Sequence, residues 1–311
     1  MRRSQKVKFR ESFRKEGRRP QGIYDGTKKT VVEAIEDWLQ LYEHQRFSGQ
    51  THEAYKYCMK SFVKTLPDGA LFIVDLTCDH VENYLDELQK SNYKVATINS
   101  YLKIVKVFCK WLAKRYKVPD PTQTLANLKP RRSDRRFLSR EEYIRLLTVC
   151  DERIVPWIKF LAVTGVRASV FCGLRWSMYN PDDKTLHIPA SIAKGCRART
   201  IGLNKTARAV LNNIRKHRSS LPGDLVFTVK NRKPLNRKLL HKKVSKGFKH
   251  LGLSGGPHLL RHYCATELLR AGVPIIKVSK FLGHADIATT QRHYEHLVVS
   301  DFAHIAEALD V

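Results

Sequence analysis

Four residues near the carboxyl end of the chain have side chains that could do chemistry together. They are two histidines, an arginine and a tyrosine in the motifs H-L-L-R, L-G-H and R-H-Y-E-H: His258, Arg261, His284 and Tyr294. Histidine transfers protons near neutral pH, arginine binds phosphate oxygens through paired hydrogen bonds, and a tyrosine phenol can act as a nucleophile. The combination predicts cleavage of a phosphodiester through a covalent bond to tyrosine.

Taken singly, each of these residues has an ordinary structural explanation. A histidine and an arginine three positions apart occur by chance on many helices, and a histidine after Gly283 can simply cap the helix that this glycine ends. Tyr294 is the only tyrosine after Tyr263 and would also suit a half-buried structural position. The prediction therefore depends on the four residues together and on what the rest of the chain supplies.

The three motifs together resemble the carboxy-terminal signature of the tyrosine recombinase (phage integrase) family, which is H-x-x-R, L-G-H and a terminal tyrosine. Upstream, T-G-V-R-A-S-V-F-C-G-L-R-W resembles the family's first catalytic arginine segment, and A-K-G-C-R-A-R-T-I-G-L resembles its catalytic lysine segment. The resemblance extends over nearly the whole chain and implies six catalytic residues. They are Arg167, Lys194, His258, Arg261, His284 and Tyr294, the last as nucleophile.

The sequence departs from the family pattern at two points. Val170 stands where family members commonly carry a glutamate, which puts local packing in question more than activity. The gap from His284 to Tyr294 is ten positions (294 − 284 = 10), one longer than the commonest gap in the family. Because no other tyrosine follows Tyr263, Tyr294 remains the expected nucleophile.

The resemblance implies a role for each residue in a reaction that needs no cofactor. A phenol with a pKa of about 10 needs a cationic field or a base to react at neutral pH, and Arg167, Arg261 and Lys194 would supply that field. The two guanidiniums would hold the phosphate oxygens, as a divalent metal does elsewhere, and the lysine would protonate the departing 5′-oxygen. His258 would assist proton transfer and His284 would bind the phosphate. The expected product is a 3′-phosphotyrosine, without metal or ATP.

Composition indicates the partner. The chain carries 57 Lys and Arg against 29 Asp and Glu, a net charge of +28 with a pI of about 10.0, which favours a polyanion and above all nucleic acid. An acidic membrane surface is the alternative, but no apolar run approaches the ~20 residues of a transmembrane helix, and no signal peptide is visible. The seven scattered cysteines predict reduced thiols. We expect a cytoplasmic, nucleoid-associated protein.

By the same resemblance, the amino-terminal half is expected to hold DNA rather than to cut it. Residues 1–29 are predicted to be a basic arm, since the first twenty hold nine Lys or Arg against two acids. Residues 30–117 are predicted to form a helical domain that opens with the capping box Thr30-x-x-Glu33, and by resemblance this is the SAM-like core-binding domain. Its further helices are expected at about 52–65, 79–90 and 95–116.

The carboxy-terminal half must position the six residues. Residues 118–136, with three prolines and a basic end, are predicted to be the linker to a catalytic domain at 137–311. That domain opens with a second capping box at Ser139 and is predicted helical to about Arg175. A β-hairpin is expected at about 184–203, then helices from Asn204 to the end. The expected fold class is mainly α with a small antiparallel sheet.

These observations favour a site-specific DNA recombinase that integrates or excises a mobile element, acting by resemblance as a homotetramer on double-stranded DNA. An Xer-type chromosome resolvase, a non-cleaving DNA-binding protein of the same fold and a type IB topoisomerase are the alternatives. Accessory DNA-bending or directionality proteins and the target sequence stay open. The amphipathic carboxy-terminal segment could dock on a neighbouring protomer or fold back on its own domain.

Overall fold

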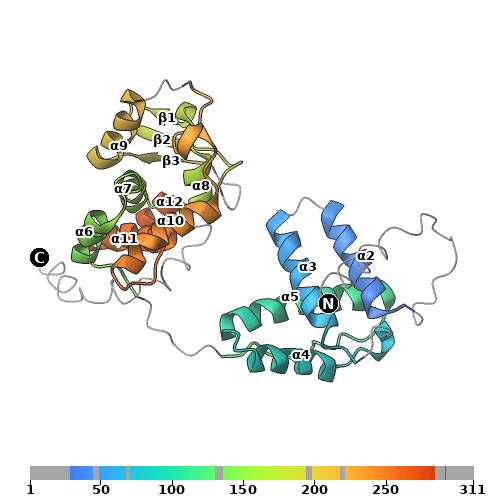
Figure 1. The fold of residues 1–311 in the computed structure, drawn as a ribbon. Coiled ribbons are helices and arrows are strands. Elements are labelled where there is room, and N and C mark those ends of the chain that lie inside the picture. The colour runs from blue at the N-terminus through green and yellow to red at the C-terminus, as the bar shows by residue number, and fades with distance from the viewer. Residues whose placement is uncertain are drawn as a thin grey trace, which may run out of the picture. The chain divides into compact units, whose positions relative to one another are not determined.

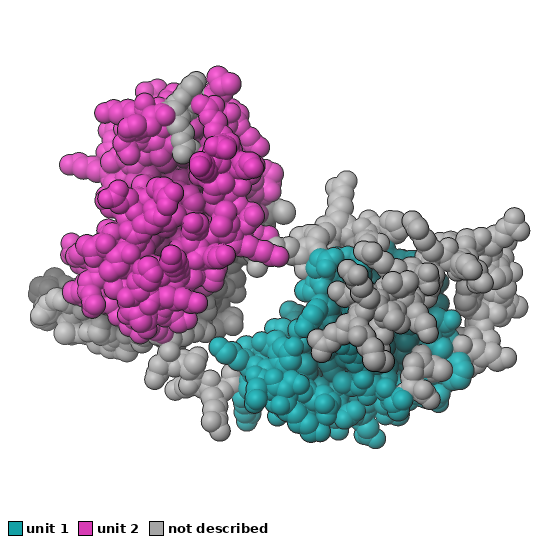
Figure 2. All heavy atoms as spheres, viewed as in Figure 1, with its two compact units in different colours: residues 1–134 teal, residues 135–311 magenta. Residues whose placement is uncertain are grey.

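The chain folds as two compact units, residues 1–134 and 135–311 (Figure 2). The computed structural model describes residues 29–44, 49–67, 71–129, 136–193, 198–217, 221–283 and 291 (Figure 1). Most of the predicted basic arm and the candidate carboxy-terminal helix lie outside these ranges. Within them, no helix is long and apolar enough to cross a membrane.

The amino-terminal unit is helical, as predicted. Its buried side chains form one core around Trp38, Phe62 and Phe108. In the longest described helix, which falls where a helix was predicted at 95–116, apolar side chains from Ile98 to Leu112 are buried along one face and the lysines lie on other faces. The described elements are the helices α2 Val31–His44, α3 Gly49–Val63, α4 Cys78–Lys90 and α5 Val95–Tyr116, and the 3-10 turn η2 Ile73–Asp75.

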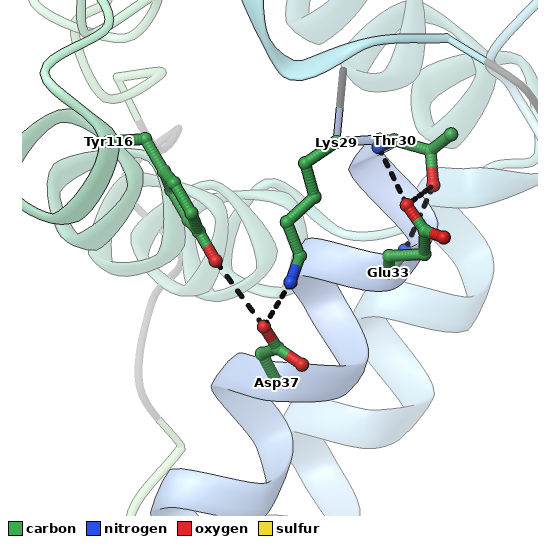
Figure 3. Close-up of polar contacts among 5 residues, drawn as sticks. All are labelled: Lys29, Thr30, Glu33, Asp37 and Tyr116. Atoms are coloured by element: carbon green, nitrogen blue, oxygen red, sulfur yellow. Dashed lines mark hydrogen bonds and ion pairs between the residues drawn. The ribbon is translucent and has the colours of Figure 1, made fainter. Parts of the chain in front are cut away.

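The start of α2 is fixed by a set of polar contacts (Figure 3). The Thr30 backbone N–H donates to the Glu33 carboxylate at 3.0 Å, and the Glu33 N–H donates to the Thr30 hydroxyl at 3.2 Å, which is the predicted capping box. One turn later, Asp37 accepts hydrogen bonds from Lys29 and, at 3.3 Å, from the phenol of Tyr116. These contacts join the first turns of α2 to the end of α5.

The carboxy-terminal unit is mostly helical with one small antiparallel sheet, which confirms the predicted fold class. The strands are β1 Tyr179–Asn180, β2 Thr185–Ile188 and β3 Arg199–Gly202, in the order β1-β2-β3, so the predicted hairpin is β2 and β3. The described α-helices are α6 Arg140–Val149, α7 Val155–Thr164, α8 Ala168–Gly173, α9 Lys205–Lys216, α10 Arg237–His250, α11 Pro257–Arg270 and α12 Ile275–Leu282.

Most helix starts in this unit follow from local sequence. Ser139 and Glu142 form the second predicted capping box, and the Asn204 side chain accepts from the Ala207 N–H at 2.9 Å to begin α9. The stretch expected to be helical to about Arg175 is divided, because Gly165 takes a left-handed φ of 57° and ends α7. This break places Arg167 at the start of a new helix.

The core of the unit lies between α7, α8, α11 and the sheet. Its largest fully buried side chains are phenylalanines, of which Phe171 and Phe227 stack at 3.9 Å between ring centroids. Phe160 meets Phe227 edge-on at 5.0 Å. Since α7 and α11 pack side by side along this core, the residues at their ends are held in a fixed geometry.

Candidate active site

Arg261 joins three segments of the carboxy-terminal unit. It lies in the second turn of α11 and is 3% exposed. Its Nη1 donates to the carbonyl oxygen of Gly165 at 2.6 Å, and its Nη2 donates to the carbonyl oxygen of Leu282 at 2.8 Å. These carbonyls lie at the carboxyl ends of α7 and α12, where helix carbonyls lack partners within the helix. A positive group is favourable there.

This arrangement places the turn that carries Arg167 beside the end of α12. Gly165 precedes Arg167 by two residues in the sequence. Gly165 itself is required for the close approach, because a Cβ at this position would lie 2.6 Å from Cδ2 of Leu282. The turn T-G-V-R thus packs directly on the end of α12.

Arg167 is the residue immediately before α8 and is half-buried. Its Nη1 is buried and has no hydrogen-bond partner among the described residues. Burial lowers the pKa of Arg167 from its ordinary value. Because a guanidinium stays charged at any pH near neutrality, the site holds a positive group that its described neighbours do not neutralise.

Arg199 is a third arginine at this place, and the sequence analysis did not single it out. It begins β3, and its Nε and Nη2 are buried without hydrogen-bond partners among the described residues. Burial, and then the positive charge of Arg167, lower the pKa of Arg199 to about 10, which still leaves the side chain cationic at neutral pH. The sequence feature that could have identified Arg199 is the alternation of side chains along a strand, which puts Arg199 on the same face as the buried Ile201.

His258 lies in the first turn of α11, one turn before Arg261. Its side chain is exposed, and its ring meets that of His262 at 4.4 Å between centroids with an interplanar angle of 72°. An exposed imidazole next to a buried guanidinium is where a proton carrier could reach a phosphate held by the arginine.

Three of the six predicted residues lie outside the described ranges. These are Lys194, which falls between β2 and β3 in the sequence, and His284 and Tyr294, which follow α12 in the sequence. The structure does describe the other tyrosine of this region, Tyr263, which is 7% exposed and stacks on Tyr143 at 4.6 Å. Burial raises the pKa of Tyr263 to about 12, which makes it a poor nucleophile.

The apolar residue at position 170 suits its surroundings. Val170 lies in α8, is fully buried and belongs to the core that contains Phe171 and Leu174. A glutamate here would enter that core. The departure from the family pattern is therefore matched by the packing around α8.

The comparisons with known proteins cover both units. The sequence model of the phage integrase family matches residues 136–300, and that of the phage integrase N-terminal SAM-like domain matches residues 35–116. The tyrosine recombinase XerC of Roseiflexus castenholzii is 30% identical over 283 residues, which cover 85% of this chain and 89% of the relative.

Solved structures show the same fold at lower identity. A Tn1549 transposon integrase in complex with a circular intermediate DNA has a TM-score of 0.77 at 16% identity, covering 90% of this chain and 99% of that chain. A lambda integrase tetramer bound to a Holliday junction has a TM-score of 0.71 at 16% identity, covering 91% and 86%. The family model extends over more than half of the chain and spans the arginines described above. The chain belongs to the tyrosine recombinase family, the phage integrase family.

Proposed function

We propose that the protein cleaves and rejoins DNA at specific sites through a covalent bond to Tyr294, and that it integrates or excises a mobile element. The observation that carries this proposal is the Arg261 guanidinium, which is held against the Gly165 carbonyl at 2.6 Å beside the turn that carries Arg167. Buried arginines of this kind are suited to a phosphate, since they hold it with permanently charged, paired donors. The net charge of +28 supports DNA as the source of that phosphate.

The proposed reaction has two steps that mirror each other. The Tyr294 oxygen attacks the scissile phosphorus, the P–O5′ bond breaks, and Lys194 gives a proton to the departing 5′-oxygen. Arg167 and Arg261 stabilise the charge on the non-bridging oxygens, with His284 as a further hydrogen-bond donor, while His258 takes the phenol proton. A 5′-hydroxyl from another strand then attacks the 3′-phosphotyrosine, which restores the phenol.

The proposed partner is double-stranded DNA bound by both units. Residues 30–117 would be the core-binding domain, residues 137–311 the catalytic domain, and residues 118–136 the linker between them, with the basic arm of residues 1–29 adding phosphate contacts. The fold shared with a lambda integrase tetramer on a Holliday junction supports a homotetramer on two DNA sites. Accessory DNA-bending or directionality proteins would be further partners.

The test begins by finding the DNA site. Randomised duplexes are selected for binding to Tyr294→Phe, which is expected to bind but not to cut, and the selected sequence is rebuilt as a nicked suicide duplex. Wild type should form an adduct that survives denaturing electrophoresis. Tyr294→Phe should form none, whereas the matched control Tyr263→Phe should keep it. If wild type forms no adduct on the selected site, the protein binds DNA without cutting it and the proposal is wrong.

The same assay tests the absence of a cofactor. Adduct formation in EDTA, without added nucleotide, should equal that in buffer alone, because arginine and lysine side chains supply the charge and the proton. A loss of adduct in EDTA that added Mg²⁺ restores would contradict this part of the proposal.

An Xer-type resolvase is the second candidate, and the relative named XerC that is 30% identical favours it. The selected site distinguishes the two functions. Copies of the site at both ends of an integrated element support the integrase, whereas one site at a fixed chromosomal position supports the resolvase. Relaxation of supercoiled plasmid without strand exchange would instead indicate a topoisomerase.

A further inference from the structure

Arg199 has no role in the mechanism described above, yet it is among the least satisfied polar side chains that the structure describes. Its Nε and Nη2 are both buried and lack hydrogen-bond partners among the described residues. A buried polar nitrogen without a partner costs free energy, and a buried charge costs more. A guanidinium in this position therefore points to a ligand that accepts hydrogen bonds and carries negative charge.

The location of Arg199 ties it to the other arginines. Its guanidinium lies on the face of Gly283 from which a side chain would project, with Nη1, Cζ and Nε at 2.5, 2.7 and 2.9 Å from the position of an added Cβ. Gly283 directly follows Leu282, whose carbonyl accepts from Arg261 at 2.8 Å. Arg199 and Arg261 thus meet the same turn, where α12 ends.

Arg199 is also close to Arg167. The positive charge of Arg167 is the second cause, after burial, of the lowered pKa of Arg199, and Nη1 of Arg167 is likewise buried without a described partner. No carboxylate among the described residues forms an ion pair with either side chain. Two neighbouring cations without a counter-ion repel each other, and an anion bound by both would relieve that repulsion.

The strand explains why this arginine points inwards. In β3, Ile201 is buried while Thr200 and Gly202 are exposed, so position 199 belongs to the inner face of the strand. The Cα of Arg199 pairs with that of Ile188, the last residue of β2, so Arg199 lies where the paired strands of the hairpin begin to separate. An ordinary surface arginine would be expected on the other face.

We propose that Arg199 is a third guanidinium of the phosphate site and contacts the same phosphate as Arg167 and Arg261. The identity of that phosphate as a DNA phosphodiester rests on the proposed function, whereas the anion site itself does not. Arg199 donates hydrogen bonds to the non-bridging oxygens through Nε and Nη2. The alternative is a packing role, in which Arg199 only supports the turn at Gly283.

The first experiment uses inorganic sulfate as the probe and needs no DNA. Sulfate affinity is measured by titration calorimetry at constant ionic strength for wild type, Arg199→Met, Arg199→Lys and the control Arg145→Met, whose arginine is exposed on α6 in the same unit. Arg199→Met should bind sulfate at least about tenfold more weakly, as loss of charged hydrogen bonds implies. Arg199→Lys should recover part of the loss, and Arg145→Met should match wild type.

The melting temperature in chloride separates the two roles of Arg199. With no sulfate to neutralise it, the buried charge opposes folding, so Arg199→Met should melt at or above the wild-type temperature. A packing role predicts a lower melting temperature and an unchanged sulfate affinity. Unchanged sulfate affinity in Arg199→Met overturns the proposal. If that variant does not fold, Arg199→Lys takes its place, and an affinity for sulfate equal to that of wild type overturns the proposal.

The second experiment removes the charge from the substrate instead. The selected suicide duplex is made with a neutral methylphosphonate at the scissile position, and adduct rates are compared for wild type and Arg199→Met on both substrates. The defect is the ratio of the wild-type adduct rate to that of Arg199→Met on the same substrate. If Arg199 contacts this phosphate, that ratio should be about tenfold or more smaller on the neutral substrate. A packing role leaves the same defect on both. If wild type cleaves neither substrate, the proposed function fails while the sulfate result still decides the role of Arg199.

Discussion

The Nη1 of Arg261 donates a hydrogen bond of 2.6 Å to the carbonyl oxygen of Gly165, across 96 positions of sequence. With the second bond to Leu282, this guanidinium links the end of α7, the end of α12 and the first turns of α11. Its removal would leave two helix ends without their partner and the proposed phosphate site without one of its positive charges. Arg261 therefore holds these helix ends together and is, in the proposed function, also a group that binds the phosphate.

Arg261→Lys should lose activity and stability together. A lysine keeps the charge but cannot donate to both carbonyls, so adduct formation should fall by at least about 100-fold. Either the Gly165 or the Leu282 carbonyl would then lack its donor, which should lower the free energy of unfolding by about 1–3 kcal/mol. Urea denaturation and the adduct assay measure the two effects. Arg270→Lys, in the exposed ion pair with Glu267 at 3.1 Å, is the control and should change stability by less than about 0.5 kcal/mol.

Gly165→Ala should destabilise the protein more than a glycine-to-alanine change at an equivalent open turn. Gly165 has φ 57° and no space for a Cβ, which would meet Leu282 at 2.6 Å. Gly272 has φ 75° but nothing within 4 Å. Left-handed strain alone should cost about 1–2 kcal/mol in Gly272→Ala, and the clash should add about 1–3 kcal/mol in Gly165→Ala. Equal losses of stability in urea would show that the contact with α12 is loose.

Gly283→Ala should displace the Arg199 guanidinium, because the new methyl group would take the space that Nη1 and Cζ occupy. The affinity for sulfate should fall by an amount close to that in Arg199→Met. The double variant Gly283→Ala with Arg199→Met should bind sulfate no more weakly than either single variant. Calorimetric titration of the three variants gives this comparison. Additive losses would mean that the two residues act on sulfate independently.

Glu142 should make stability depend on pH in the acid range. The backbone N–H of Ser139, and then Arg136, hold the pKa of Glu142 below its ordinary value of 4.5. A carboxyl group with a lowered folded pKa stabilises the protein fully above pH 4.5 and loses that contribution as pH falls through the folded pKa. Glu142→Gln should therefore cost about 0.5–1 kcal/mol at pH 7, as loss of a capping carboxylate implies, and progressively less as the pH falls below 4.5. Glu152→Gln, at an exposed position, is the control and should change stability at pH 7 by less than about 0.5 kcal/mol.

The helices of both units could be predicted from local sequence. Apolar periodicity identified α5, and the capping boxes at Thr30 and Ser139 identified the starts of α2 and α6, since these signals depend only on neighbouring residues. The hairpin followed from the change of period. The helix break at Gly165, where a left-handed φ of 57° ends α7, was missed. The sequence does not show that this turn packs against Leu282, more than 100 positions away.

Only those residues of the candidate site that belong to a recognisable sequence motif could be predicted. His258 and Arg261 were predicted from residue type and spacing, and Arg167 from the resemblance. The structure adds that Arg261 bonds the turn before Arg167, while the catalytic roles of all three stay predictions. Arg199 was not found, since among many arginines only its packing against Gly283 and its unsatisfied nitrogens distinguish it. Lys194, His284 and Tyr294 stay predictions.

The central claim is that Tyr294 becomes bonded to DNA, and the most direct measurement is mass spectrometry of the trypsin-digested adduct after nuclease treatment. Cleavage after Arg292 gives the peptide of residues 293–311, and cleavage after Arg261 gives that of residues 262–270, which contains Tyr263. We predict the residual nucleotide on Tyr294 in the first peptide, joined through a 3′-phosphate. A nucleotide on Tyr263, on any other residue, or joined through a 5′-phosphate would contradict the account.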